Sequence, residues 1–257
     1  YEDLASYFGE YDGGFVLFDT QDGQYCIYYR EKSVKRVSPA STVKIYSALI
    51  AMDAGVITPA RSERPWNGTS YPYEVWNRDH DLSSAMQNSV SWYFQNTDAQ
   101  VGKAALTDYY ERIAYGNHDL SGSVSDYWME SSLRISPIEQ VELLTAFVRN
   151  DTIFQSEHVD AVKNTLRLSE KDGEVLSGKT GTGAVNGKRV NGWFVGYVEA
   201  KDRTFIFATN IPAEEAAGGN AAVPIPCSIL PARGIYGWNS TAHAAYTPLP
   251  PPAIRTP

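Results

Sequence analysis

Residues 175–210 read VLSGKTGTGAVNGKRVNGWFVGYVEAKDRTFIFATN. The runs LSGKTGTG, VNGWFVGYVEA and RTFIFATNI are separated by clusters of Gly, Asn and Asp, which commonly interrupt strands. This pattern predicts three successive antiparallel strands. A second strand-rich stretch, GFVLFDTQDGQYCIYY at residues 14–29, has an Asp-Gly turn signal between two apolar runs and predicts a hairpin.

The chain between these two blocks carries apolar residues at helical spacing, most clearly at residues 41–54, 82–101, 107–113 and 137–147. Strands, then helices, then strands are typical of an α+β fold. We expect an antiparallel sheet formed by both chain ends and flanked by helices, with an all-helical region inserted between them.

The boundaries follow from this pattern. We expect one folded domain over residues 1–238, with the sheet part at about 1–40 and 170–238 and the helical region at about 41–169. Residues 239–257 are rich in Pro and Ala and are expected to form a disordered tail.

The composition limits the partners. The 257 residues carry a net charge of −8, and no run of Lys and Arg is dense enough to follow a phosphate backbone, so nucleic acid is not expected. Apolar stretches such as residues 46–52 and 205–211 are too short to span a bilayer, so the chain as given is expected to be soluble, in a compartment left open. Cys26 and Cys227 either pair or remain isolated thiols. The four histidines show no metal-ligand spacing, so no metal site is expected.

Ser41-Thr42-Val43-Lys44 opens one of the predicted helices. Residues three apart share a helical face, so the Lys44 amine can reach the Ser41 hydroxyl, and the helix N-terminus favours negative charge there. This is an activated nucleophile in principle. A lone Ser-x-x-Lys is also what a capped surface helix contains.

Two further short motifs gain meaning from their order. Lys179-Thr180-Gly181 lies in a predicted strand and forms either an electropositive wall for a carboxylate-bearing substrate or a solvated strand edge. Ser89 and Ser91, in Ser-Val-Ser, are informative only because they stand between the other two motifs.

Longer stretches carry a family resemblance. PASTVKI (39–45), AMQNSVSWYFQ (85–95), YGN (115–117), YWMESSLRISPIEQVELL (127–144) and GKTGTGAVNGKRVNGWFVGYVE (178–199) together resemble the class D β-lactamases. They resemble still more closely the extracellular penicillin-sensor domains of the BlaR1 and MecR1 receptors. The similarity covers roughly residues 7–236, with the motifs in the family's order and spacing.

The resemblance implies a serine β-lactamase/penicillin-binding fold and assigns catalytic roles. Ser41 would be the acylated nucleophile. Lys44 would be its general base, carboxylated by carbon dioxide in the active form, with Trp128 donating a hydrogen bond to the modified lysine. Ser89 would relay a proton to the leaving β-lactam nitrogen. Lys179 completes the catalytic set, and no metal or organic cofactor is implied.

The resemblance also implies a substrate-binding set. Lys179, Thr180 and Thr182 would bind the substrate carboxylate, with Gly181 and Ser91 lining the same site. The backbone N–H groups of Ser41 and Thr182 would form the oxyanion hole. No Arg occurs between residues 210 and 222, where many class D hydrolases place a carboxylate-binding Arg, so Thr182 would do more of that work.

Three functions remain open. The first is an extracytoplasmic antibiotic sensor with slow deacylation, attached to a membrane segment outside this chain; polar Ser91, which could weaken a Lys44 carbamate, favours it. The second is a class D β-lactamase that hydrolyses penicillins and cephalosporins, favoured by Ala40, where familiar sensors have Asp or Cys. The third is a D-alanyl-D-alanine transpeptidase, which would not explain YGN or YWMESSL.

Overall fold

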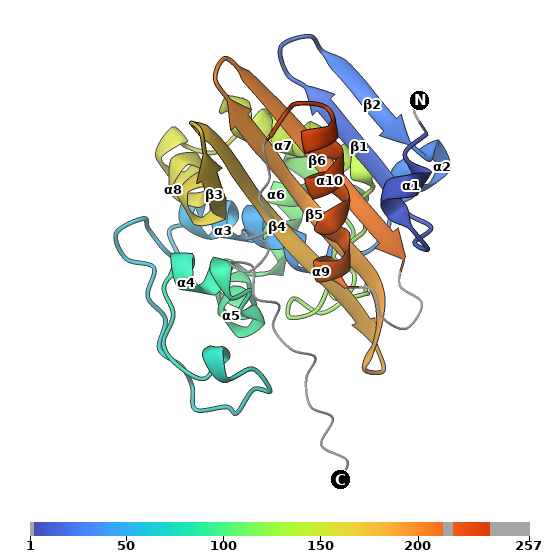
Figure 1. Cartoon of the computed structure of the whole chain (residues 1–257). Coiled ribbons are helices and arrows are strands. Elements are labelled where there is room, and N and C mark those ends of the chain that lie inside the picture. Colours follow the sequence, from blue (N-terminus) through green and yellow to red (C-terminus); the bar gives the residue numbers. More distant parts are fainter. Residues whose placement is uncertain (1–2, 213–217, 237–257) are drawn as a thin grey trace.

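A computed structural model describes residues 3–212 and 218–236 (Figure 1). Its centre is a six-stranded antiparallel sheet in the order β2-β1-β6-β5-β4-β3. The strands are β1 (Gly14–Asp19), β2 (Gln24–Tyr28), β3 (Arg167–Lys171), β4 (Glu174–Val185), β5 (Lys188–Ala200) and β6 (Arg203–Pro212). The predicted hairpin and the three predicted strands are present, and β1 pairs directly with β6. The predicted α+β fold, with a sheet built from both chain ends, is confirmed.

Both faces of the sheet are buried, because successive strand residues point to opposite faces. On β1, Val16 faces the larger core and Phe15 the smaller one. On β5, Val195 and Phe194 divide in the same way. Figure 1 shows the short C-terminal helices α9 (Gly219–Ala222) and α10 (Pro224–Ala232) crossing one face of the sheet. The near-continuous apolar runs of the strands therefore reflect burial on both sides.

The other face is covered by the helical part of the chain. Its longer helices are α3 (Lys44–Asp53), α4 (Leu82–Gln87), α5 (Ser91–Val101), α6 (Lys103–Arg112), α7 (Pro137–Arg149) and α8 (Ser156–Leu166). Smaller elements are α1 (Ala5–Phe8), α2 (Arg30–Ser33) and the 3₁₀ turns η1 (Ala40–Val43) and η2 (Glu74–Trp76).

The helical pattern predicted at residues 82–101 is two helices in the structure. α4 ends at Gln87 and α5 begins at Ser91, because Ser89 has a φ of 51° and a right-handed helix cannot pass through that conformation. The break leaves Ser89 between the two helices, outside both.

Cys26 and Cys227 are both buried and free. Within the described ranges, no helix combines the length and apolar composition that a membrane crossing requires. The disordered tail expected at residues 239–257 lies outside the described residues.

Candidate active site

Ser41 lies in η1 and Lys44 begins α3, so the two side chains share one helical face. Lys44 is completely buried, and its Nζ donates a hydrogen bond to Ser41 Oγ at 2.9 Å. The segment before Ser41 is fixed through the Ser38 carbonyl, which accepts hydrogen bonds from Asn191 Nδ2 at 2.7 Å and Trp193 Nε1 at 2.8 Å. Strand β5 therefore holds the turn that presents the Ser41 hydroxyl.

Ser89 approaches Lys44 from the break between α4 and α5. Lys44 Nζ lies 2.8 Å from the Ser89 carbonyl oxygen and 3.1 Å from its Oγ, and 3.2 Å from Ser91 Oγ. With Ser41, this places four oxygens within hydrogen-bonding distance of one buried amine. The Ser41, Ser89 and Ser91 side chains are half-buried, so the group borders solvent.

A Schellman motif at the end of α4 sets the position of Ser89. The Val90 N–H donates to the Ala85 carbonyl at 2.9 Å, and the Ser89 N–H donates to the Met86 carbonyl at 3.2 Å. This motif needs a left-handed residue after the cap, and glycine is the usual choice. Here the left-handed residue is Ser89, whose backbone is strained in this conformation. In this position its hydroxyl lies next to Lys44 Nζ.

Lys179 joins the group from β4. Its Nζ donates to Ser89 Oγ at 3.0 Å and to the Thr180 carbonyl at 3.0 Å. Ser89 Oγ thus lies between the amines of Lys44 and Lys179. Four of the residues singled out in the sequence, Ser41, Lys44, Ser89 and Lys179, form one continuous hydrogen-bonded chain.

Gly181 allows β4 to lie against the Ser41 turn. A Cβ at Gly181 would meet the Pro39 carbonyl oxygen at 3.0 Å and the Ser41 nitrogen at 3.2 Å. β3 pairs with β4 only as far as Ser177, so in the described structure η1, and not a strand, lies beside the following part of β4. Here β4 has η1, rather than a strand, as its neighbour on that side.

The two threonines of this strand lie apart from the amine group. Thr180 is nearly buried, with the start of α9 over it: a Cβ at Gly219 would be 2.8 Å from Thr180 Cβ. Thr182 is exposed, and its Oγ1 accepts a hydrogen bond from the Gly219 N–H at 2.8 Å. The structure therefore places both hydroxyl side chains at the α9 side of β4.

Trp128 closes the other side of Lys44. Its ring centroid is 5.1 Å from Lys44 Nζ, and Phe94 contributes a second ring at 5.5 Å. Trp128 is 2% exposed, and its Nε1 has no hydrogen-bond partner among the described residues. A buried donor without an acceptor is costly, so this N–H is available to an acceptor introduced near Lys44.

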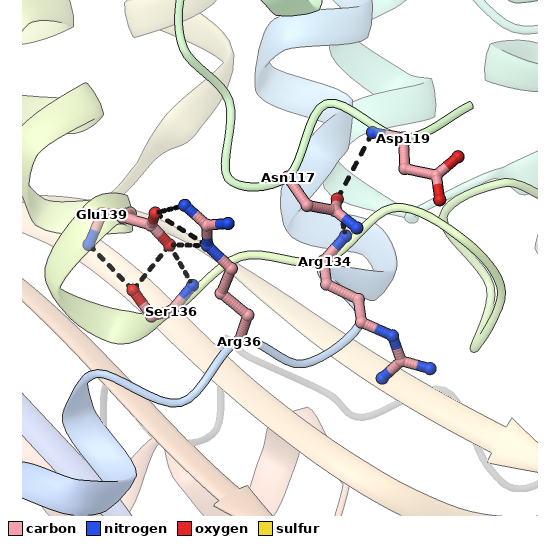
Figure 2. Close-up of polar contacts among 6 residues, drawn as sticks. All are labelled: Arg36, Asn117, Asp119, Arg134, Ser136 and Glu139. Carbon is pink, nitrogen blue, oxygen red and sulfur yellow. Dashed lines mark hydrogen bonds and ion pairs between the residues drawn. The ribbon is translucent and has the colours of Figure 1, made fainter. Parts of the chain in front are cut away.

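The loop carrying Trp128 is fastened by the residues shown in Figure 2. Asn117 Oδ1 accepts from the Arg134 N–H at 2.7 Å, and Arg36 Nε donates to Glu139 at 2.9 Å. Ser136 and Glu139 form the capping box that begins α7. The YGN and SPIE stretches therefore hold the loop in place. They are not part of the hydrogen-bonded group that contains Ser41.

Burial and neighbouring charge shift the pKa values at this site. Burial, reinforced by the charge of Lys179, lowers the pKa of Lys44 well below its usual range, and Asp98 opposes the shift. Burial lowers the pKa of Lys179 to about 7. Both amines can therefore shed a proton far more easily than an exposed lysine, as a general base requires.

Sequence reasoning missed Asp98. This carboxyl is completely buried in α5, and burial raises its pKa to about 7 against the effects of Tyr127, Ser47 and Lys44. Its position four residues after Phe94, on the same helical face, was the available signal.

The family model of the penicillin-binding protein transpeptidase domain matches residues 13–230. The chain belongs to this family. This transpeptidase-family domain is 48% identical to the regulatory protein BlaR1 of Bacillus licheniformis over 92% of the chain and 39% of that protein. It is 43% identical to the methicillin resistance mecR1 protein of Staphylococcus aureus (strain Mu50) over 88% of the chain and 39% of that protein. The chain thus spans about two fifths of the length of these relatives.

Two solved structures resemble the transpeptidase-family domain closely. The C-terminal domain of the Bacillus licheniformis BlaR penicillin-receptor has a TM-score of 0.88 and 47% identity, over 92% of this chain and 97% of that one. The class D β-lactamase BAT-2 has a TM-score of 0.86 and 34% identity, over 92% and 98%. The predicted resemblance to BlaR1/MecR1 sensor domains and class D β-lactamases is confirmed. Among the described residues, no three His, Cys, Asp or Glu side chains are grouped to hold a metal ion.

Proposed function

We propose that this domain senses β-lactam antibiotics: a β-lactam acylates Ser41, and the acyl-enzyme persists as the signal. One observation carries the proposal. The completely buried amine of Lys44 lies 2.9 Å from Ser41 Oγ and is linked through Ser89 Oγ to Lys179. A hydroxyl beside a buried amine of lowered pKa is an activated nucleophile.

Acylation uses this chain of contacts. Ser41 Oγ attacks the β-lactam carbonyl carbon and gives its proton to the Lys44 side chain. The backbone N–H groups of Ser41 and Thr182 stabilise the oxyanion. Ser89 Oγ, within 3.1 Å of Lys44 Nζ, then passes a proton to the ring nitrogen as the C–N bond breaks.

The substrate carboxylate binds on β4. Protonated Lys179 supplies the positive charge, and the hydroxyl of exposed Thr182 is a further donor to the carboxylate. Thr180, expected in this role from the sequence, is nearly buried under α9 and is left out of the proposed carboxylate site. The edge of β4 beyond Ser177 has no strand partner in the described structure, so we expect the substrate acylamide to lie along this edge next to Ser41.

Lys44 carries carbon dioxide as an N-carboxyl group in the form that acts as base. The residues around Nζ fit this group, because Trp128 Nε1 is a buried donor without a partner among the described residues. The hydroxyls of Ser41 and Ser89 can also donate. The carboxylated lysine would supply a carboxylate oxygen as the proton acceptor.

Ser91 supports the persistence of the acyl group. Lys44 Nζ donates to Ser91 Oγ at 3.2 Å, which favours the unmodified amine over its carboxylated form. Loss of the carboxylated base after acylation removes the group that would activate the hydrolytic water. The acyl-enzyme then survives long enough to signal.

A class D β-lactamase is the second candidate. The unpartnered Trp128 N–H favours it, because the same donor would retain the base through deacylation. The likeness to BAT-2 at 34% identity is consistent with that activity.

We also place the domain outside the cytoplasm, as the ectodomain of a membrane receptor. The support is that the chain matches 39% of the length of BlaR1 and of mecR1, so those relatives contain further segments. A segment that spans the membrane would carry the signal inward.

The deciding experiment mixes the purified domain with excess nitrocefin and follows absorbance, with intact-mass analysis after penicillin exposure. We expect a stoichiometric burst and a lasting mass adduct, both absent in Ser41→Ala. Sustained turnover without an adduct would establish the β-lactamase instead. Labelling that persists in Ser41→Ala would overturn the assignment of Ser41 as the nucleophile.

A further inference from the structure

Asp98 is a completely buried carboxyl within α5. Its Oδ2 accepts hydrogen bonds from Tyr127 Oη at 2.9 Å and from Ser47 Oγ at 3.4 Å. Its Oδ1 has no hydrogen-bond partner in the described part of the chain. A buried carboxylate with unused acceptor capacity is stable only if a positive charge faces it or if it takes up a proton.

The facing charge is Lys44. Lys44 and Ser47 lie three residues apart on α3, and Phe94 and Asp98 lie four apart on α5, so each pair shares a helical face. Lys44 Nζ is 5.5 Å from the Phe94 ring while Ser47 donates to Asp98. The lysine and the carboxyl therefore belong to one contact between α3 and α5.

The charges around this contact come from several elements. Asp98 raises the pKa of Lys44, whereas Lys179 on β4 lowers it. Tyr110 on α6 and Tyr127 also face the carboxyl, and burial raises the pKa of both phenols, so they remain neutral. Of the described residues whose charges shift the pKa of Lys44, Lys179 is the cation and Asp98 is the anion.

We propose that Asp98 is a positioning residue that controls whether Lys44 can bind carbon dioxide, an inference that rests on the N-carboxylation of Lys44 proposed above. A bond forms between the neutral Nζ amine and the carbon of carbon dioxide, one C=O electron pair moves to oxygen, and Nζ loses one proton. The lysine gains a negative charge, which an ionised Asp98 repels. Asp98 takes up one proton for each proton that Nζ releases, so the pair keeps its total charge.

The burial that holds the pKa of Asp98 at about 7 makes this exchange accessible near neutral pH. At fixed dissolved carbon dioxide, carboxylation without proton uptake would increase about tenfold for each pH unit. With uptake by Asp98, the ratio of carboxylated to free Lys44 levels off above about pH 7.

The experiment measures that ratio by ¹³C NMR with ¹³C-bicarbonate from pH 6 to pH 9, and the bicarbonate concentration is raised with pH so that dissolved carbon dioxide stays constant. In the unaltered chain we expect the ratio to level off above about pH 7. In Asp98→Asn we expect the ratio to equal that of the unaltered chain below pH 7 and to keep rising above it. At pH 8 the excess is about tenfold if carboxylation of Lys44 raises the pKa of Asp98 by two units, and about fivefold if it raises that pKa by one unit.

Asp53→Asn is the matched control. Asp53 is the last residue of α3, the helix that begins at Lys44, and it accepts a hydrogen bond from Tyr109 Oη at 2.7 Å. It is not among the residues whose charge shifts the pKa of Lys44. We expect the unaltered pH profile. Tyr127→Phe is the second variant, because it removes a donor that lowers the pKa of Asp98 and should move the plateau to higher pH.

Circular dichroism and labelling of Ser41 by a fluorescent penicillin report folding of each variant. Identical pH profiles for the unaltered chain, Asp98→Asn and Tyr127→Phe would overturn the role of Asp98 and leave the carboxylation of Lys44 standing. If no variant gives a carbamate resonance while penicillin still labels Ser41, both the carboxylation and the role of Asp98 are wrong, and acylation stands.

Discussion

The Val90 N–H donates to the Ala85 carbonyl at 2.9 Å, which closes α4 around a left-handed Ser89. A non-glycine residue in this conformation costs roughly 1–2 kcal/mol. The cost is accepted where the Ser89 hydroxyl meets the amines of Lys44 and Lys179. Stability and activity therefore compete at a single residue.

Two substitutions at Ser89 separate these effects. Ser89→Ala and Ser89→Gly both remove the hydroxyl, so we expect both to slow acylation by penicillin about a hundredfold, a typical value for a proton-transfer group. Only glycine relieves the strain, so Ser89→Gly should be about 1 kcal/mol more stable than Ser89→Ala in urea denaturation. Equal stabilities would show that the left-handed backbone carries no cost here.

Ser91→Val tests the proposed origin of slow deacylation. Loss of the hydroxyl that accepts from Lys44 Nζ at 3.2 Å should favour the carboxylated lysine and speed deacylation. The decay of the intact-mass adduct measures the rate. Ser91→Thr is the control, since Thr has the shape of Val but keeps the hydroxyl, and should retain slow decay. An unchanged rate in Ser91→Val would count against the explanation.

The pH dependence of acylation should reflect Lys179. Burial lowers its pKa to about 7, so the amine that attracts the substrate carboxylate loses its charge as the pH rises through that value. The second-order rate constant of acylation should then fall with increasing pH above 7. Lys179→Arg remains charged throughout, because a guanidinium does not deprotonate in this range. We expect its stopped-flow profile to stay flat to pH 9, and a parallel fall would exclude Lys179 as the titrating group.

Trp128→Phe keeps a ring beside Lys44 but removes the unpartnered N–H. We expect a weaker ¹³C carbamate resonance than in the unaltered chain at equal bicarbonate, the direction opposite to Asp98→Asn. Trp92→Phe removes an N–H that already donates to the Trp76 carbonyl at 2.9 Å, so the resonance should be unaffected. A full-strength resonance in Trp128→Phe would mean that another donor holds the modified lysine.

The sequence predicted the sheet well, because β1, β5 and β6 contain long apolar runs bounded by turn residues. It did not predict α10, which packs on the sheet, because Pro224 and Pro231 lie in this segment and proline normally argues against a helix. It also did not predict β3, whose sequence RLSEK is mostly polar and partly exposed.

The candidate site was predictable to different degrees. The spacing of Ser41 and Lys44 implied their contact directly, because both lie on one helical face. Ser89 was recognised only by its order between the other motifs, since no glycine marks its left-handed turn. Asp98 was missed because a polar residue in a helix is normally exposed, and only tertiary packing buries this one.

The pairing of β1 with β6 has a consequence for biosynthesis. Gly14 lies opposite Asn210 and Asp19 opposite Phe205, so the middle of the sheet joins segments from opposite ends of the chain. An isolated two-stranded hairpin is marginally stable, and contacts of such long range form slowly. The middle of the sheet therefore cannot close until β6 leaves the ribosome, and until then the apolar strand β1 is exposed to aggregation and to chaperones.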